Sequence, residues 1–344
     1  MASGLLESPL KEALALSRPE PSEARLGDIF VGKAYMPPPY CERNDSMAFA
    51  SVGPLRHKAN IYYRGIRARD WFGYLGMCAV GYALGVVATP SSAFDPLLMA
   101  KSAVSCALFL AFCFSINNYA DVDGDRLDPA KVKKNPVASG MLSPREALAL
   151  STAIALCGLA IAVTMPNLIS LGFYLVLELL GWAYSVPPLR LKGRPVADVV
   201  SHGLMLGVLL FLFGHSAATP ELFSQEAILV SASMFTSSVI FELRNHLSDI
   251  VADSISGTLT TVGWLGEEAS RRLMLAVTAV HLVLLTAVLF MSTDLAVYLA
   301  PAAVTLVSAL VLTRRVSPER GLDCLTVGVY IVAVVPRVVM LLLA

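Results

Sequence analysis

The sequence predicts an all-α integral membrane protein, and three observations support this class. Of the 344 residues, 56% are hydrophobic and only 15% are charged. A soluble domain carries about 25% charged residues, so this chain has too little charge to cover a surface that faces water. From Trp71 onward, apolar segments of about 20 residues follow one another, which is the length that crosses a hydrocarbon core of about 30 Å. Of the loops between these segments, finally, every second one contains neither Lys nor Arg.

Nine membrane spans account for the apolar segments. Their approximate bounds are 71–90, 97–119, 146–165, 167–186, 196–218, 226–247, 270–292, 295–313 and 321–343. The residues before them are polar and include the run Met36-Pro37-Pro38-Pro39-Tyr40, and no apolar core follows a basic start, so we expect no secretory signal there. We therefore predict an irregular cytoplasmic tail over residues 1–64 and a membrane domain over residues 65–344.

The charges of the loops give an independent test of this span count. The loops on one side carry many basic residues, namely Arg56, Lys58, Arg64, Arg67, Arg69, Arg126, Lys131, Lys133, Lys134, Arg145, Arg190, Lys192, Arg194, Arg271, Arg272, Arg314, Arg315 and Arg320. The loops on the other side carry neither Lys nor Arg. By the positive-inside rule, the N-terminus faces the cytoplasm and the C-terminus lies on the opposite side of the membrane. Because acidic and basic residues balance at 26 each, nothing in the whole-chain charge favours binding to nucleic acid.

Two oxygen-rich motifs share one spacing and follow apolar segments. The first consists of Asn117, Asp121 and Asp125, and the second of Asn245, Asp249 and Asp253. Residues four apart lie on the same face of a helix, so each motif presents three oxygen-bearing side chains together. The charge pattern puts both motifs on the cytoplasmic side.

These residues suit a hard divalent cation. Carboxylate and amide oxygens bind Mg²⁺, Mn²⁺ or Ca²⁺ in preference to zinc or copper, and Mg²⁺ usually takes further ligands from water and substrate phosphates. Basic residues that could hold such a phosphate follow in nearby loops, and they are Lys131, Lys133, Lys134, Arg190, Lys192 and Arg194. The combination suits a diphosphate leaving group on an apolar substrate, because bound metal neutralises the departing charge and an apolar bundle shields the carbocation from water.

Other interpretations of the motifs are weaker. An EF-hand is excluded because Arg126 and Val132 stand where that loop requires Gly and Glu. The triplet Asp121-Val122-Asp123 resembles the acidic pair of metal-dependent glycosyltransferases but leaves the second motif unexplained. A solvated acidic loop does not explain a repeat 128 residues later, and a transporter would place its carboxylates near the midplane of the membrane.

Several polar residues remain within the predicted spans. For Asp198 and Arg337, a structural ion pair and a role in a site are both open. For His202, His215 and His281, hydrogen bonds between packed helices are favoured.

The motifs resemble those of the UbiA superfamily of intramembrane prenyltransferases. The first signature of that family, Asn-Asp-x-x-Asp-x-x-x-Asp, corresponds to Asn117-Asn118-x-x-Asp121-x-x-x-Asp125, and the second corresponds to Asp249, Asp253 and Gly257. The segment Tyr184–Lys192 resembles the family's Tyr-Ser-x-x-x-x-Arg-x-Lys. The likeness covers about residues 65–343.

The resemblance implies a nine-helix bundle with a central cavity and a cytoplasmic cap, and it assigns roles to named residues. Two Mg²⁺ ions would join the aspartates of the two motifs to an isoprenyl diphosphate, with Asn117 and Asn245 assisting. Tyr184 would lie near the reacting carbon. The candidates for diphosphate contacts are Lys134, Arg190 and Lys192.

Two departures from the family pattern stand out. Asn118 replaces the usual Asp at a position that points away from the main face of the motif. The family's Asn-Arg-Pro reads Lys134-Asn135-Pro136 here, so its basic residue is displaced by one position.

The expected activity is Mg²⁺-dependent transfer of an isoprenyl group from its diphosphate to an acceptor at the membrane, as in isoprenoid biosynthesis. The acceptor could be an aromatic ring, a lipid hydroxyl of the glycerol type or a sugar phosphate. A membrane terpene cyclase of the same superfamily, which needs no acceptor, is one alternative. A non-enzymatic carrier of prenyl phosphates is the other.

Overall fold

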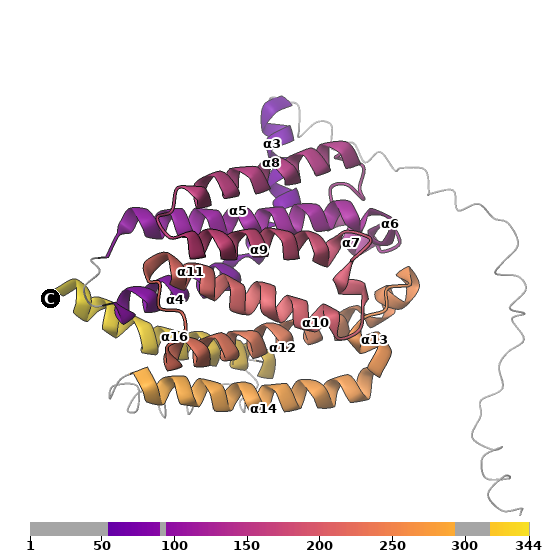
Figure 1. Ribbon diagram of the computed structural model, residues 1–344. Helices are drawn as coiled ribbons and strands as arrows, with labels where there is room; N and C mark the ends of the chain where they lie inside the picture. Colours follow the sequence, from indigo (N-terminus) through magenta and orange to yellow (C-terminus); the bar gives the residue numbers. More distant parts are fainter. Residues whose placement is uncertain (1–53, 90–93, 293–316, 344) are drawn as a thin grey trace, which may run out of the picture. The chain divides into compact units, whose positions relative to one another are not determined.

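The computed structural model describes residues 54–89, 94–292 and 317–343, and within these ranges it contains helices and no strands (Figure 1). The helices are α3 (Pro54–Ile66), η1 (Ala68–Asp70), α4 (Phe72–Ala88), α5 (Pro96–Ala120), α6 (Val122–Asp125), α7 (Pro129–Lys134), α8 (Pro144–Val163), α9 (Leu168–Ser185), η2 (Leu191–Gly193), α10 (Ala197–His202), η3 (Gly203–Leu209), α11 (Leu210–Ala218), α12 (Gln225–Ser256), α13 (Thr261–Leu265), α14 (Glu267–Ser292) and α16 (Pro318–Leu343).

Among the described residues, seven helices are long and apolar enough to cross a membrane, or eight if the bent pair of α3 with η1 and α4 counts as one span. Eight of the nine predicted spans therefore fall on helices of the structure, with α10, η3 and α11 together forming one of them. The predicted span at 295–313 lies outside the described residues, so the count of nine remains a prediction. The sides on which the termini lie also remain predictions.

The helices of the bundle begin at residues whose side chains satisfy free backbone N–H groups. Asp95 accepts hydrogen bonds from the N–H groups of Leu97 and Leu98 at the start of α5. Ser143 and Glu146 form a reciprocal capping box at the start of α8. Asn167 caps α9, which follows α8 after the short turn around Pro166. These caps explain why two spans can follow each other with almost no loop between them.

Close backbone contact joins α4 to α11. A Cβ atom added to Gly81 would lie 2.1 Å from the carbonyl oxygen of Phe211, and one added to Gly214 would lie 2.1 Å from that of Cys78. Only glycine fits at these two positions. Small residues at a helix–helix contact are the usual means by which membrane helices pack closely.

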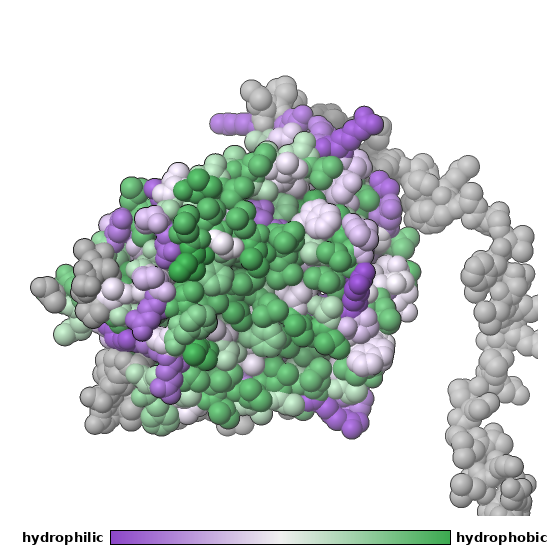
Figure 2. Space-filling model, in the orientation of Figure 1, coloured by the Kyte–Doolittle hydropathy of each residue, from purple (hydrophilic) through white to green (hydrophobic). Residues whose placement is uncertain are grey.

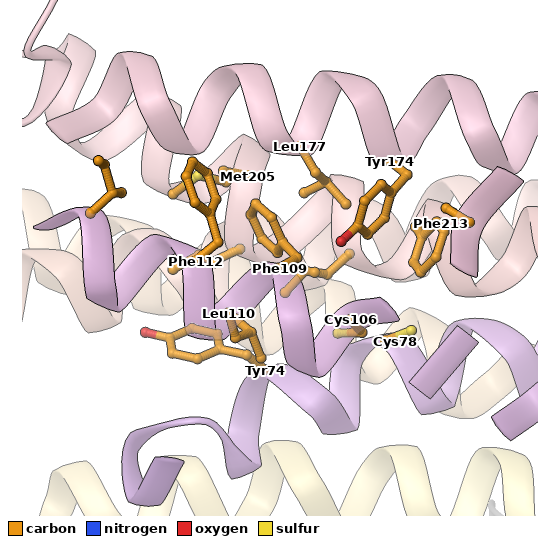
Figure 3. Close-up of a cluster of buried hydrophobic side chains, with 14 of the residues drawn as sticks. Tyr74, Cys78, Cys106, Phe109, Leu110, Phe112, Tyr174, Leu177, Met205 and Phe213 are labelled. Carbon is orange, nitrogen blue, oxygen red and sulfur yellow. The ribbon is translucent and has the colours of Figure 1, made fainter. Parts of the chain in front are cut away.

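An apolar cluster fills the space between α4, α5, α9 and the η3–α11 segment (Figure 3). Phe109, Leu177 and Phe213 are completely buried in it. The outer faces of the helices are also apolar, and Figure 2 shows a broad hydrophobic face between two more hydrophilic edges. Leu179 on α9 and Val283 on α14, for example, are 67% and 69% exposed. An apolar exterior around an apolar interior supports a multi-pass membrane protein.

Residues 1–53 of the predicted irregular tail lie outside the described residues, whereas its end is helical, because α3 begins at Pro54. Ile61 on α3 is buried against Val137 and Leu142. An amphipathic helix gains this burial from the tertiary structure, which the polar composition of the segment does not reveal.

Arg337, His215 and His281, which lie within the predicted spans, each contact a polar partner. Arg337 forms an ion pair with Glu226, so its role is structural. His215 contacts the carbonyl oxygens of Gly81 and Glu221, and His281 contacts the hydroxyl groups of two threonines, Thr236 and Thr326. The prediction of hydrogen bonds between packed helices is confirmed for both histidines.

Candidate active site

The first motif continues the helical repeat of α5 beyond the end of that helix. Asn117 lies in the last turn of α5, Asp121 lies between α5 and α6, and Asp125 ends α6. The N–H of Asp121 donates to the carbonyl of Asn117 at 3.0 Å, and the N–H of Asp125 donates to that of Asp121 at 2.8 Å. These bonds have the i to i−4 pattern of an α-helix. The three side chains therefore share one face, as the spacing predicts.

The second motif lies within one continuous helix, α12, which ends directly after it. Gly257 ends α12 with φ +70°, and the N–H of Thr258 donates to the carbonyl of Asp253 at 2.9 Å. A left-handed residue at this position favours glycine, which explains the Gly that follows the motif. Asp249 and Asp253 are partly buried, whereas Asn245 is exposed.

The two motifs meet at one end of the bundle, where Figure 1 shows α6, α7 and α13. A Cβ atom added to Gly124 in α6 would lie 3.6 Å from the Cβ of Ser256 at the end of α12. Lys131 in α7 joins the motifs more directly, since its Nζ lies 3.2 Å from Oδ2 of Asp249. Partial burial opposes the charge of this ammonium, but the carboxylates of Asp249, Asp253 and Asp125 raise the pKa of Lys131 above its ordinary value.

Two further basic residues contact the first motif from the loop after α9. Nη2 of Arg190 lies 3.0 Å from Oδ1 of Asp121, and the ammonium of Lys192 contacts Asp121 and Asn117. Arg190 holds a left-handed backbone with φ 37°, a strained conformation that is more frequent at functional sites. Burial lowers the pKa of Lys192, with the Asp121 carboxylate acting in the opposite direction. Both residues were candidates for diphosphate contacts, and the structure brings both to the acidic centre.

The position of Lys134 differs from that of Lys131. Lys134 ends α7 and is exposed, while Lys131, one turn earlier, points to the second motif. The local sequence contains three lysines within four residues, so spacing alone does not indicate which of them faces the aspartates.

Asn118 is a structural residue, which accounts for its departure from the family pattern. It is 3% exposed, and its Nδ2 donates to the carbonyl of Gly65 at 2.7 Å. Asn135 adds to this arrangement, because its Nδ2 lies 2.8 Å from the backbone carbonyl of Asn118 and 2.8 Å from Oδ2 of Asp125. A carboxylate at position 118 could not donate to Gly65. The prediction that residue 118 points away from the main face is confirmed.

The chemistry of the donor set fits a hard cation. The six motif residues offer only oxygen atoms as strong ligands. Oδ2 of Asp253 is buried without a hydrogen-bond partner, and a buried carboxylate oxygen is costly unless a cation or donor compensates it. Over the described ranges, no three His, Cys, Asp or Glu side chains form a complete metal-binding group by themselves. An ion held here would thus need further ligands from outside this set, as Mg²⁺ commonly does.

A buried polar network lies next to the motifs on the side of the apolar core. Its centre is Glu242 on α12, which is 6% exposed and accepts a short hydrogen bond from the hydroxyl of Tyr184. Nε2 of His246 lies 3.1 Å from Oε1 of Glu242, and Nε2 of His202 lies 3.3 Å from Oε2. Nδ2 of Asn245 approaches the same oxygen at 3.4 Å. The network therefore joins α9, α10 and α12 around one carboxylate.

Asp198 completes the network at its other end. Its carboxylate accepts hydrogen bonds from the N–H and hydroxyl groups of Thr261, and its Oδ2 lies 3.4 Å from Nδ1 of His246. The Thr261 hydroxyl oxygen also accepts a hydrogen bond from the N–H of Val196 at 2.7 Å. Asp198 thus holds the start of α13 against the start of α10, and this contact is structural.

Sequence reasoning missed Glu242, His246 and the position of Lys131. A signal for the first two was present, because Glu242 lies three residues before Asn245 and four residues before His246 on α12. The second motif therefore continues one turn deeper into the bundle than its signature indicates.

Comparisons with known proteins agree with this geometry. A sequence model described as the UbiA prenyltransferase family matches residues 77–327. The chain is 28% identical over 195 residues to the digeranylgeranylglyceryl phosphate synthase of Methanothrix thermoacetophila, covering 57% of this chain and 66% of that protein. It is 30% identical over 211 residues to the lycopene elongase/hydratase of Haloarcula japonica, covering 58% and 65%. The chain thus spans slightly less than two thirds of the length of these two relatives.

A solved structure provides a longer match. The UbiA homologue from Archaeoglobus fulgidus bound to GPP and Mg²⁺ superposes with a TM-score of 0.64 and 26% identity, covering 81% of this chain and 99% of that one.

Proposed function

The chain belongs to the UbiA prenyltransferase family, and from this premise we propose that it transfers an isoprenyl group from an isoprenyl diphosphate to an acceptor within the membrane. The C–O bond between the allylic carbon and the diphosphate breaks, and its electron pair leaves with the diphosphate. The acceptor forms the new bond to that carbon and loses a proton. The products are the prenylated acceptor and free diphosphate.

One observation carries the proposal. Two matching sets of oxygen ligands and three basic side chains converge at one end of an apolar helical bundle, where Lys131 contacts Asp249 and both Arg190 and Lys192 contact Asp121. Carboxylates alone would repel a diphosphate, whereas carboxylates with divalent cations and basic residues bind one. The apolar core beside them suits the isoprenyl chain.

Mg²⁺ is the proposed cofactor. Asp121 and Asp125, assisted by Asn117, would hold one ion, and Asp249 and Asp253, assisted by Asn245, would hold another. The unpaired Oδ2 of Asp253 supports this assignment. When bound, the ions supply positive charge against the departing diphosphate. The A. fulgidus homologue, which was solved with Mg²⁺ and GPP, gives further support.

The basic residues would bind the oxygens of the diphosphate. Arg190 presents a planar guanidinium that can contact two oxygens at once, and Lys192 adds a buried charge beside it. We propose Lys131 as the third contact in place of Lys134, because Lys131 already lies among the carboxylates of both motifs.

The residues around Tyr184 would receive the reacting carbon. Tyr184 directly precedes Ser185, whose hydroxyl lies 3.2 Å from Oδ1 of Asn117. The ring of Tyr184 packs against the buried apolar cluster. This position between the metal-binding motif and the apolar core supports a location next to the allylic carbon, where exclusion of water protects a carbocation.

The acceptor that we propose is a lipid, an aromatic compound or a sugar phosphate. A glycerol-type lipid hydroxyl, an aromatic ring and a sugar phosphate all present a nucleophilic atom that could reach a site at the end of the bundle. The named relatives include a digeranylgeranylglyceryl phosphate synthase and a lycopene elongase/hydratase, which indicates that family members differ in this respect.

The test is incubation of the purified full-length protein in detergent with Mg²⁺, geranylgeranyl diphosphate and a panel of acceptors. Diphosphate release and products are followed by a coupled assay and mass spectrometry. We expect a prenylated product that depends on the acceptor. A hydrocarbon formed without acceptor would instead identify a terpene cyclase. Binding without release of diphosphate would contradict both reactions and indicate a carrier.

Matched variants test the metal motifs. Asp121→Ala or Asp249→Ala should abolish turnover and leave the protein folded. Asp123→Asn is the control, because Asp123 lies in α6 beside the first motif and its side chain is 93% exposed. Near-normal activity in either motif variant would show that the scheme of two metal sites is wrong.

A further inference from the structure

The carboxylate of Glu242 has no place in the metal scheme, although it lies one turn before the second motif and contacts Asn245. It is buried in a helix that is long and apolar enough to cross a membrane. A buried acidic side chain in such a helix is expensive and usually has a function. Its four nearest polar neighbours are the Tyr184 hydroxyl, the two imidazoles and the Asn245 amide.

The arrangement of these neighbours favours an ionised carboxylate. The Tyr184 hydroxyl and the Asn245 amide donate hydrogen bonds to its two oxygens, and Nε2 of each imidazole lies within 3.3 Å of one of these oxygens. An ionised carboxylate can accept from both donors and from any imidazole N–H that is directed to it. The hydroxyl of Tyr184 has one proton and directs it to Oε1. The tyrosine therefore acts as a donor to a buried negative charge.

The ring of Tyr184 is positioned between this charge and the apolar core. It packs against the buried cluster of α4, α5 and α9, and its centroid lies 6.2 Å from that of the His202 imidazole. His202 is in turn stacked on Phe241 with an interplanar angle of 14°, while Ser238 contacts its Nδ1 at 2.9 Å. Contacts on several sides thus hold the hydroxyl and the ring in one orientation.

A hydrogen bond to an anion increases the electron density of a phenol ring. The face of an electron-rich ring attracts a cation more strongly, and the attraction is larger where water is excluded. We propose that Glu242 is a positioning residue that orients Tyr184 and makes its ring a better stabiliser of the allylic carbocation. This inference rests on the proposed function, in which the C–O bond breaks and its electron pair leaves with the diphosphate.

The test measures diphosphate release by the full-length protein with Mg²⁺, geranyl diphosphate and the panel of acceptors named above, in single-turnover and steady-state experiments. It compares the wild type with Glu242→Gln, Tyr184→Phe and the double variant. Glutamine keeps an oxygen that accepts the tyrosine hydrogen bond but removes the charge. We expect Glu242→Gln to lower the rate constant by about tenfold, in line with a cation–π contribution of ordinary size, and to leave the KM for geranyl diphosphate within about twofold.

Two further measurements separate this role from a merely structural one. In the Tyr184→Phe background, Glu242→Gln should have little additional effect, because the link through the hydroxyl is already absent. With 2-fluorogeranyl diphosphate, whose fluorine destabilises the cation, both single variants should lose more activity than they lose with geranyl diphosphate. Glu178→Gln is the control, since it makes the same chemical change in α9 and should leave both rates unchanged.

The outcomes are distinct. A Glu242→Gln variant with the wild-type rate, or effects of the two substitutions that simply add, would overturn the inference and leave the proposed function intact. If Glu242→Gln does not fold, Tyr184→Phe decides, and an unchanged rate and an unchanged fluorine effect in that variant would overturn it. If the wild type releases no diphosphate from any allylic diphosphate, both the proposed function and this inference fail.

Discussion

Changing Asn118 to the Asp that is usual in this family should destabilise the protein. The side chain is buried, and its Nδ2 donates to the carbonyl of Gly65 at 2.7 Å. In Asn118→Asp, a carboxylate oxygen would face this carbonyl oxygen, so two acceptors would meet without a proton between them. The contact that joins the end of α3 to α5 would become repulsive.

The size of the effect follows from the burial of both partners. A buried polar group left without its hydrogen bond costs about 1–3 kcal/mol, and a charged group costs more. We therefore expect a loss of about 3 kcal/mol for Asn118→Asp and about 1 kcal/mol for Asn118→Ala, which removes the donor without adding a charge. At about 2 °C per kcal/mol for a large chain, Asn118→Asp should lower the apparent Tm by about 6 °C.

The assay is thermal unfolding in one detergent, followed by the rate of diphosphate release at a temperature where all variants are folded. The expected order of stability is wild type, Asn118→Ala, then Asn118→Asp. An Asn118→Asp variant that matched the wild type in Tm and exceeded it in activity would refute this reasoning. It would indicate that residue 118 serves the site and not the contact with Gly65.

Three further predictions concern other parts of the molecule. Lys131→Met should lower kcat/KM for the isoprenyl diphosphate by about 10–100-fold in steady-state assays, which is the effect of losing a charge-assisted hydrogen bond. Lys134→Met should change kcat/KM by less than about twofold. Equal effects of the two substitutions would contradict the assignment of Lys131. Gly81→Ala should destabilise the protein by about 1–3 kcal/mol in thermal unfolding, because the added Cβ would lie 2.1 Å from a backbone oxygen in the α4–α11 contact. Gly76→Ala should not destabilise the protein, because no atom lies within 4 Å of the Cβ added there. Removal of divalent cations with EDTA should stop diphosphate release and added Mg²⁺ should restore it, and full activity in EDTA would exclude the metal scheme.

The class of the protein and the motifs could be predicted from the sequence because both depend on local patterns. Apolar length and the alternation of charged loops identify membrane helices wherever they pack. The spacing of Asn117, Asp121 and Asp125 places them on one face as soon as that stretch is helical, and the backbone hydrogen bonds confirm this.

Contacts between distant residues could not be predicted in this way. Lys131 and Lys134 are equivalent in a local pattern, and only the approach of α7 to α12 brings Lys131 to Asp249. Likewise, Asn118 differs from a metal ligand only through its contact with Gly65, 53 residues earlier.

The sequence by itself determined that this chain is a helical membrane protein with two repeated oxygen-ligand motifs and a resemblance to one family. The tertiary structure alone decided which basic side chain reaches both motifs, why Asn118 is an amide, and that Glu242 meets Tyr184. Hydrophobic periodicity indicates which face of a helix is buried, but it does not indicate which other helix packs against that face. Tyr184 on α9 and Glu242 on α12 are 58 residues apart, and they meet because both helices pack beside His202 at the end of α10.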